Sequence, residues 1–242
     1  MGLKPQITLR STLHHWWLDQ VARQGRVAAL RIFFIELWGF LRDSTPASRR
    51  QRYGDMDYDW DFRVDTTSGT VGWRERLLGT FHSAYQPTEP FLFHEMVQSL
   101  GIEYSDFTFI DLGSGKGRTL LMASEYPFQR IVGVELLPAL HRVAVENLQK
   151  FRSPAQRCFA LESRCEDARQ FQFPPEPLVL YLFNPLPEAG LVPVVQNLES
   201  SLRERPRPIR VVYLNPLLRH VLDATSLRIL RSAEHYLVYG ER

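Results

Sequence analysis

The 242-residue sequence predicts an α/β fold with a doubly wound, mostly parallel sheet of seven strands, an antiparallel last strand, and an N-terminal helical arm. Three observations support this prediction. The segment Phe107–Arg118 (FTFIDLGSGKGR) is an apolar run that ends in three alternating glycines. Further apolar runs alternate with helical patterns after it. The last two runs, Leu227–Arg231 and His235–Tyr239, have the short connection of an antiparallel hairpin.

The first 52 residues have a different character from the rest. They contain nine Lys and Arg against three acidic residues, a balance of +6, which leaves −4 for the remainder of a chain whose net charge is +2. Within them, Val27–Leu41 predicts a helix that is apolar nearly all the way round. The run is too short and too charged to span a membrane. We therefore divide the chain into an arm, 1–52, and a domain, 53–242.

An apolar helix of this kind needs a cover, which can be its own domain, a second subunit or a bilayer surface. We expect packing on its own body or a homodimer, with membrane-surface contact through residues 13–41 as the alternative. The composition is that of a cytoplasmic globular protein, which would be peripheral to a membrane in that alternative. The two cysteines do not support a metal site. The sequence gives no specific nucleic-acid signal.

The segment Asp55–Asp65 (DMDYDWDFRVD) interleaves five aspartates with aromatic residues. Dense like charge favours a solvated or disordered loop. The alternative is a lip over a binding site that attracts a cationic or amine substrate.

An amphipathic helix with Leu92 and Met96 on one face is expected to begin after Thr88 and to stop at Gly101. Thr88 is the expected N-cap. The entry turn precedes the first strand, so we expect Tyr85 and Thr88 to contact the ligand; the alternative is that they cap the core and the helix.

The glycine turn is the expected ligand site. Glycine lets the backbone turn sharply and lets a ligand approach where a Cβ would collide. Asp111 lies two residues before Gly113, where its carboxylate would point into the site. Glu135 ends the next strand, Arg130–Glu135, where an acid takes both hydroxyls of a ribose.

The remaining strands bring further polar residues to the same edge of the sheet. A helix over Pro138–Lys150 leads to a strand at Cys158–Arg164, after which Asp167 can accept from an adenine amino group and the Ala168 N–H can donate to the ring. The alternative for the acidic pair Glu166-Asp167 is a simple turn.

The apolar strand Pro177–Phe183 ends on Asn184, which we expect at the mouth of the same crevice, against the group that reacts. A helix over Glu188–Leu202 and a strand over Ile209–Leu214 follow.

From about Trp60 onward, the D-x-G-x-G-x-G pattern followed by Glu135 resembles the S-adenosylmethionine site of class I methyltransferases, which have a Rossmann-like fold. Within them, DLGSGKGR and GVELLP are most similar to the Dot1-type and related seven-strand lysine methyltransferases and their bacterial relatives. The resemblance implies S-adenosylmethionine as cofactor and a role for these residues: the loop Gly113, Ser114, Gly115 and Gly117 cradles the methionine portion, Glu135 holds the ribose and Asp167 the adenine.

The resemblance also bears on the methyl acceptor. Asn184-Pro185 is similar to the start of the N-P-P-aromatic motif of amine methyltransferases, but Leu186 and Pro187 stand where the second proline and the aromatic would be. We expect methyl transfer to an amine nitrogen of a protein lysine or a small molecule. The alternatives are a non-catalytic S-adenosylmethionine-binding or scaffold protein, a small-molecule or lipid O-methyltransferase, and a dehydrogenase-like nucleotide protein.

Overall fold

The structure is a computed structural model that describes residues 9–43, 56–67 and 86–241. Contacts along the chain divide it into two compact units. One unit contains the helices of the N-terminal arm, and the other contains residues 58–66 together with the chain from Pro87 onward. The domain boundary expected at residues 52 and 53 lies outside the described residues and stays a prediction.

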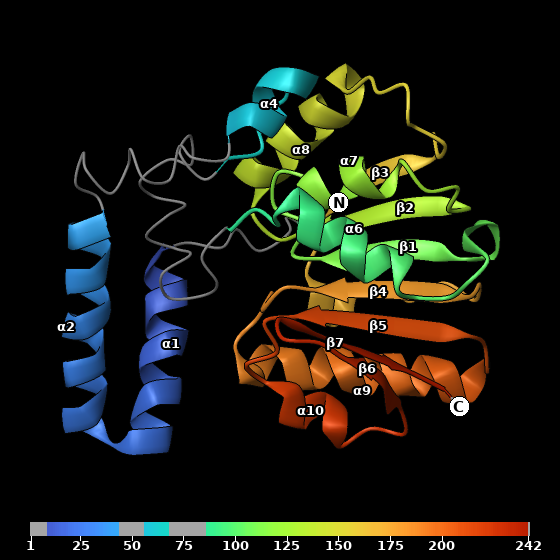
Figure 1. Cartoon of the computed structure of the whole chain (residues 1–242). Helices are drawn as coiled ribbons and strands as arrows, with labels where there is room; N and C mark the ends of the chain where they lie inside the picture. Colours follow the sequence, from blue (N-terminus) through green and yellow to red (C-terminus); the bar gives the residue numbers. More distant parts are fainter. Residues whose placement is uncertain (1–8, 44–55, 68–85, 242) are drawn as a thin grey trace, which may run out of the picture. The chain divides into compact units, whose positions relative to one another are not determined.

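The arm is a pair of helices, α1 (Leu9–Gln24) and α2 (Arg26–Asp43), joined at Gly25, whose φ of +81° lets the chain reverse (Figure 1). The ring of Trp16 meets that of Phe33 across the pair at 6.0 Å. The helix predicted over residues 27–41 is confirmed.

One side of α2 exposes large apolar residues at helical spacing, namely Val27, Leu30, Phe34, Ile35 and Trp38. The cover that such a helix requires stays a prediction. Over the ranges that the structure describes, no helix is both long and apolar enough to cross a membrane.

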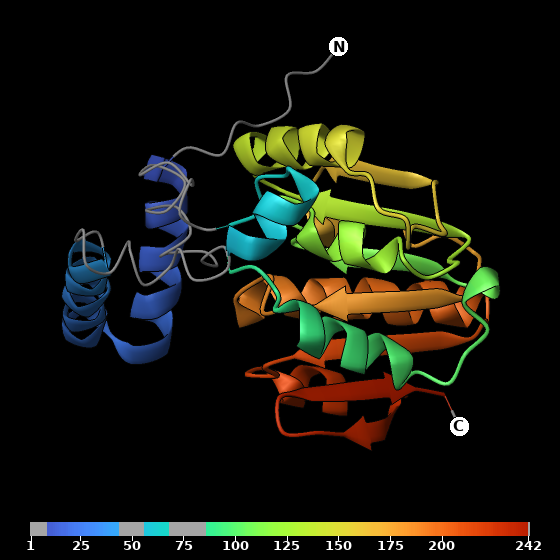
Figure 2. The same cartoon turned by 45° about the horizontal axis from the view of Figure 1, so that its top comes forward.

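The second unit is built on a seven-stranded sheet of order β3-β2-β1-β4-β5-β7-β6, as Figures 1 and 2 show. Strands β1 to β5 are parallel, and β7 is antiparallel to both β5 and β6. This is the predicted fold. The strands are β1 (Thr108–Leu112), β2 (Arg130–Glu135), β3 (Leu161–Cys165), β4 (Leu178–Leu182), β5 (Ile209–Leu214), β6 (Arg228–Ser232) and β7 (Tyr236–Gly240).

Helices cover both faces of this sheet, which explains why β1 and β4 are buried along their whole length. One face packs against α6, α7 and the end of α8, and the other packs against α9 and α10. The helices of this unit are α4 (Met56–Phe62), α6 (Pro90–Gln98), α7 (Arg118–Ala123), α8 (Pro138–Lys150), α9 (Glu188–Glu204) and α10 (Arg219–Asp223), with short 3-10 turns η3 (Tyr104–Asp106) and η4 (Ala168–Gln170).

The register of the sheet determines which polar residues meet. Asp111 pairs with Gly133 on β2 and with Tyr181 on β4. Glu135 ends β2 and Asn184 follows β4, so both lie at the carboxyl edge of the sheet. Binding sites of open α/β sheets form at this edge. The third strand begins three residues later than expected, at Leu161.

Candidate active site

The glycine loop (residues 113–117) joins β1 to α7, and each of its three glycines has a positive φ. The N–H groups of Gly113 and Ser114 both donate to the carbonyl oxygen of Val134, at 2.8 and 3.1 Å. The loop is therefore tied to the end of β2. Positive φ is readily adopted by glycine alone, so the predicted reason for the glycine pattern holds.

The loop packs closely against its protein neighbours. A Cβ placed on Gly113 would lie 2.9 Å from the Cβ of Pro185, and one on Gly133 would lie 2.6 Å from the Ser114 Oγ. That Oγ is buried and has no hydrogen-bond partner within the described part of the chain. A buried unpaired hydroxyl costs free energy unless a partner satisfies it. Contact of this hydroxyl with the methionine portion of S-adenosylmethionine stays a prediction.

Glu135 closes the other side of the loop. Its carboxylate accepts from the N–H of Gly115 at 2.8 Å and from the N–H of Leu137 at 2.7 Å. Burial raises the pKa of Glu135, and the backbone N–H bonds oppose that rise. Because a carboxylate has about four acceptor positions, these two bonds leave capacity for the hydroxyls of a ribose.

Asp111 lies below the loop on the face of the sheet that α7 covers. It is 3% exposed and accepts from the hydroxyl of Thr119. Burial raises the pKa of Asp111 to about 7; the Thr119 bond acts against this rise, and the charge of Glu135 adds to it. The two acids thus belong to one electrostatic site. Direct contact between Asp111 and a ligand stays a prediction.

The expected role of Thr88 as the N-cap of α6 is wrong. Glu89 caps this helix through the N–H groups of Phe91 and Leu92, at 3.2 and 2.9 Å. Thr88 is buried instead, with its hydroxyl 2.8 Å from that of Tyr181, the β4 residue that pairs with Asp111. The exposed carboxylate of Glu89 can cap the helix, whereas the buried hydroxyl of Thr88 needs a hydrogen-bond partner and finds it in the hydroxyl of Tyr181. Tyr85 lies outside the described residues.

The pair after β3 forms a turn. Asp167 caps η4 by accepting from the N–H of Arg169 at 2.9 Å, and its carboxylate also accepts from the Arg169 guanidinium at 2.5 to 3.0 Å. Ala168 is 8% exposed. An adenine amino group would share the carboxylate with Arg169, so the adenine contact of this pair stays a prediction.

Asn184 is held in place at the end of β4. Its Nδ2 donates to the carbonyl oxygen of Asn215 at 2.8 Å, and its Oδ1 accepts from the hydroxyl of Tyr213 at 3.0 Å. A carbonyl oxygen only accepts, so the amide nitrogen must face Asn215. Both asparagines have a positive φ, of +42° and +47°, and both precede a proline. The two Asn-Pro turns thus form one connected structure.

The expectation of a solvated or disordered loop is wrong for the acidic segment (residues 58–66). Most of it is helical, in α4, and two of its acids pair with cations of the glycine motif. Asp65 contacts Lys116 at 2.7 Å, and Asp59 contacts Arg118 at 3.3 Å. These cations are more than 50 residues further along the chain, so composition alone did not indicate the pairing.

The cations themselves were missed by sequence reasoning. Lys116 and Arg118 are 1% and 2% exposed. Burial lowers the pKa of Arg118 to about 10, and its guanidinium also stacks 4.9 Å from the centre of the Tyr58 ring. The only signal in the sequence was that two basic residues lie in the glycine motif and that a separate segment is rich in acids.

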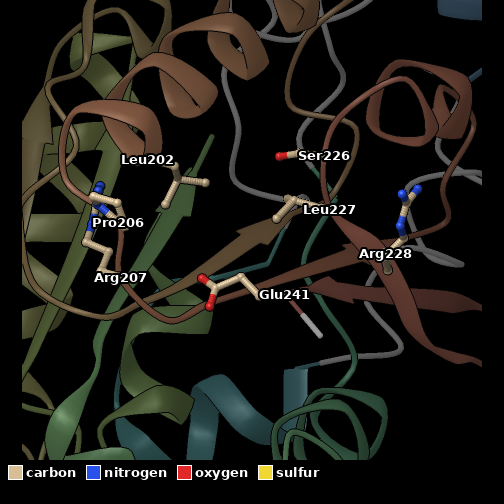
Figure 3. Close-up of a pocket in the computed structure, with 7 residues that line it drawn as sticks. All are labelled: Leu202, Pro206, Arg207, Ser226, Leu227, Arg228 and Glu241. Atoms are coloured by element: carbon tan, nitrogen blue, oxygen red, sulfur yellow. The ribbon is translucent and has the colours of Figure 1, made fainter.

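A cavity of 450 Å³ lies elsewhere in this unit, between the C-terminal end of α9 and the strand ends opposite to the glycine loop. Figure 3 shows the seven side chains that line it, among them Arg207, Arg228 and Glu241. None of the residues predicted for the ligand site belongs to this lining.

One protein family matches the part of the chain that contains the glycine loop. Residues 80–166 match the family described as "Histone methylation protein DOT1". The matched stretch includes the glycine loop and Glu135 and ends before β4. The antiparallel last strand separates the sheet from the six parallel strands of a dinucleotide-binding fold. The chain is a class I S-adenosylmethionine-dependent methyltransferase.

Solved structures of other methyltransferases resemble it at low sequence identity. The precorrin-6y C5,15-methyltransferase of Geobacter metallireducens is 15% identical, with a TM-score of 0.49 over 64% of this chain and 91% of that one. The RNA methyltransferase of Salinibacter ruber, solved with S-adenosyl-L-homocysteine, is 22% identical, with a TM-score of 0.39 over 64% and 92%. No curated protein matches the sequence of the methyltransferase.

Proposed function

We propose that the methyltransferase transfers its methyl group to an amine nitrogen, either of a lysine side chain in a protein or of a small molecule. The observation that carries the proposal is the Asn184-Pro185 turn, which ends β4 directly beside the glycine loop. The match to a family described as a histone methylation protein supports a protein amine.

The contacts of Asn184 suggest how this turn acts. Its side chain is engaged by Tyr213 and Asn215, and its backbone has a left-handed conformation. We infer that the side chain fixes the turn and that the backbone carbonyl of Asn184 accepts the N–H of the amine. Asn184 is then a residue that both orients the acceptor and is itself held by its neighbours.

When bound, S-adenosylmethionine supplies a methyl group on a positively charged sulfur. The protein chiefly provides alignment and a dry site for such a displacement. The amine must arrive unprotonated, because its lone pair forms the new bond and the positive charge passes from sulfur to nitrogen. No proton has to leave the nitrogen during this step. A carbonyl that accepts the N–H aims the lone pair.

Three of the described histidines have contacts that fit a reaction without a dedicated base. His94 is 2.9 Å from the hydroxyl of Tyr126, and His141 is 2.8 Å from the hydroxyl of Ser163. His220 is 3.2 Å from Glu188. These are contacts on helices and their neighbours, which favour structural roles.

The acceptor can be tested by incubating the protein with methyl-tritiated S-adenosylmethionine and a cell lysate. The proposal predicts label that survives acid hydrolysis as methyl-lysine or another methylated amine. Label that base releases from a methyl ester, or label in a methyl ether, would contradict it in favour of O-methylation. Binding of S-adenosylhomocysteine without any transfer would favour a non-catalytic protein.

The role of the turn can be tested with Asn184→Ala and Tyr213→Phe. Each removes a hydrogen bond that fixes Asn184, so turnover should fall by about tenfold while the affinity for S-adenosylhomocysteine stays nearly unchanged. Asn184→Gly is the matched control for backbone strain, since glycine adopts the positive φ freely, and it should also lose turnover. A large loss of cofactor affinity would place Asn184 in the cofactor site.

A further inference from the structure

We propose that the acidic segment (residues 58–66) sets the affinity for S-adenosylmethionine by holding the glycine loop in its binding shape, with Asp65 and Asn147 as positioning residues. Neither residue belongs to the glycine motif. The inference concerns the cofactor alone and is independent of the acceptor. It rests on three sets of contacts within one compact unit.

The first contact holds the middle of the loop. The ammonium of Lys116 lies 2.7 Å from a carboxylate oxygen of Asp65. Lys116 stands between the second and third glycines of the loop and is 1% exposed. Burying an ammonium is costly, and the Asp65 carboxylate offsets part of that cost, so its removal weakens the hold on the middle of the loop.

The second contact joins Asn147 of α8 to both segments. Its Nδ2 donates to the carbonyl oxygens of Asp65 at 2.8 Å and of Lys116 at 2.9 Å, and its Oδ1 accepts from the N–H of Asp65 at 2.9 Å. Asn147 is 1% exposed. One neutral side chain thus fixes the backbone of the acidic segment against that of the loop.

The third contact holds the residue that follows the loop. The guanidinium of Arg118 donates to the Thr66 hydroxyl at 2.7 Å and to Asp59 at 3.3 Å. Asp59 also accepts from the N–H of Thr66 at 2.7 Å, which closes the segment on itself. The rings of Phe62 and Phe151 lie 5.2 Å apart, which attaches α4 to the end of α8.

These contacts hold the loop from the acidic segment and α8, whereas Glu135 and Val134 hold it from β2. A loop of glycines has large conformational freedom, and its ordering must be supplied by neighbouring groups. If the acidic segment supplies part of that order, losing it lowers the affinity by the cost of ordering the loop when the cofactor binds.

The test uses the full chain with Asp65→Ala and Asn147→Ala, and with Asp61→Asn as the matched control on the exposed side of the same segment. Hydrogen–deuterium exchange of the unliganded protein measures how well ordered the loop is. Calorimetric titration measures the affinity for S-adenosylhomocysteine. We expect the amides of residues 113–117 to exchange faster and the affinity to fall by about tenfold, while residues 228–240 keep their exchange rates.

Two further variants keep the test decisive. Asp65→Asn is milder and serves if Asp65→Ala does not fold. Lys116→Arg keeps a cation beside Asp65 and should retain more affinity than Lys116→Met. Unchanged affinity, or exchange that rises equally in residues 113–117 and 228–240, would overturn the proposal, since the segment would then be only a general stabiliser.

Discussion

Two neighbouring parts of the carboxyl edge of the sheet are built in different ways. At the ends of β1 and β2, the cofactor side, backbone N–H groups of the glycine loop are fixed by Val134 and by the buried carboxylate of Glu135. At the ends of β4 and β5, which we propose as the acceptor side, hydrogen bonds of the Asn184 side chain to Tyr213 and Asn215 fix two Asn-Pro turns.

The family match covers only one of these two parts. The match to the DOT1 family covers residues 80–166, which include the cofactor side and end before β4. A backbone loop admits few residue types, because glycine is needed where φ is positive and space is tight. Side-chain contacts admit many more. The cofactor is therefore identified, and the acceptor is a proposal.

The largest expected effect is on stability, at the point where Gly113 of the glycine loop packs against Pro185 of the first Asn-Pro turn. A Cβ on Gly113 would lie 2.9 Å from the Cβ of Pro185, and Gly113 has a φ of +84°. Gly113→Ala should lower the free energy of unfolding by about 2 to 5 kcal/mol, from the left-handed conformation and the collision together. Denaturant unfolding measures this loss.

Gly101→Ala is the matched control, because Gly101 has a φ of +61° but nothing within 4 Å of a Cβ. It should lose only the conformational part, about 1 to 2 kcal/mol. Equal losses in the two variants would mean that Gly113 and Pro185 do not constrain one another.

The second effect concerns the cofactor side alone. Glu135→Ala removes the acceptor of two backbone N–H groups and the expected partner of the ribose. Affinity for S-adenosylhomocysteine should fall by about 1 to 3 kcal/mol. Calorimetric titration checks this, with Glu146→Ala on the exposed side of α8 as the control. Unchanged affinity would refute the ribose assignment.

The last prediction concerns the pH dependence of stability. Burial raises the pKa of Asp111 to about 7, above its ordinary value of 3.8. Between these values the folded protein keeps a proton that the unfolded chain has lost, so this group makes stability fall as the pH rises through that interval. Asp111→Asn removes the fall, and the variant should gain stability relative to the wild type from about pH 4 to pH 7.

Urea unfolding across this interval measures the gain, and Asp106→Asn, an exposed residue before β1, is the control. If the Asp111→Asn and wild-type curves stay parallel, Asp111 does not keep a proton in the folded state.

The sequence predicted the sheet and the glycine turn because their signals are local. An apolar run with both faces covered, followed by alternating glycines, is readable in a dozen residues, and the structure has β1 and the loop where they were expected. The signal for the N-terminal helix over residues 27–41, a single apolar run, was equally local.

The contacts of the acidic segment could not be predicted, since they join residues more than 50 positions apart. Asp59 and Asp65 lie among like charges, and only the fold brings Lys116 and Arg118 to them. Thr88 was misassigned for a related reason: its partner, Tyr181, is 93 residues away, while the neighbouring Glu89 caps the helix.

The central claim is that the ends of β1 and β2 bind the cofactor while the ends of β4 and β5 orient the acceptor. One set of calorimetric titrations with S-adenosylhomocysteine, on the wild type, Glu135→Ala and Asn184→Ala, tests it most directly. The account predicts saturable binding to the wild type, weakened binding to Glu135→Ala and nearly unchanged binding to Asn184→Ala. Weakened binding to Asn184→Ala with unchanged binding to Glu135→Ala would contradict it.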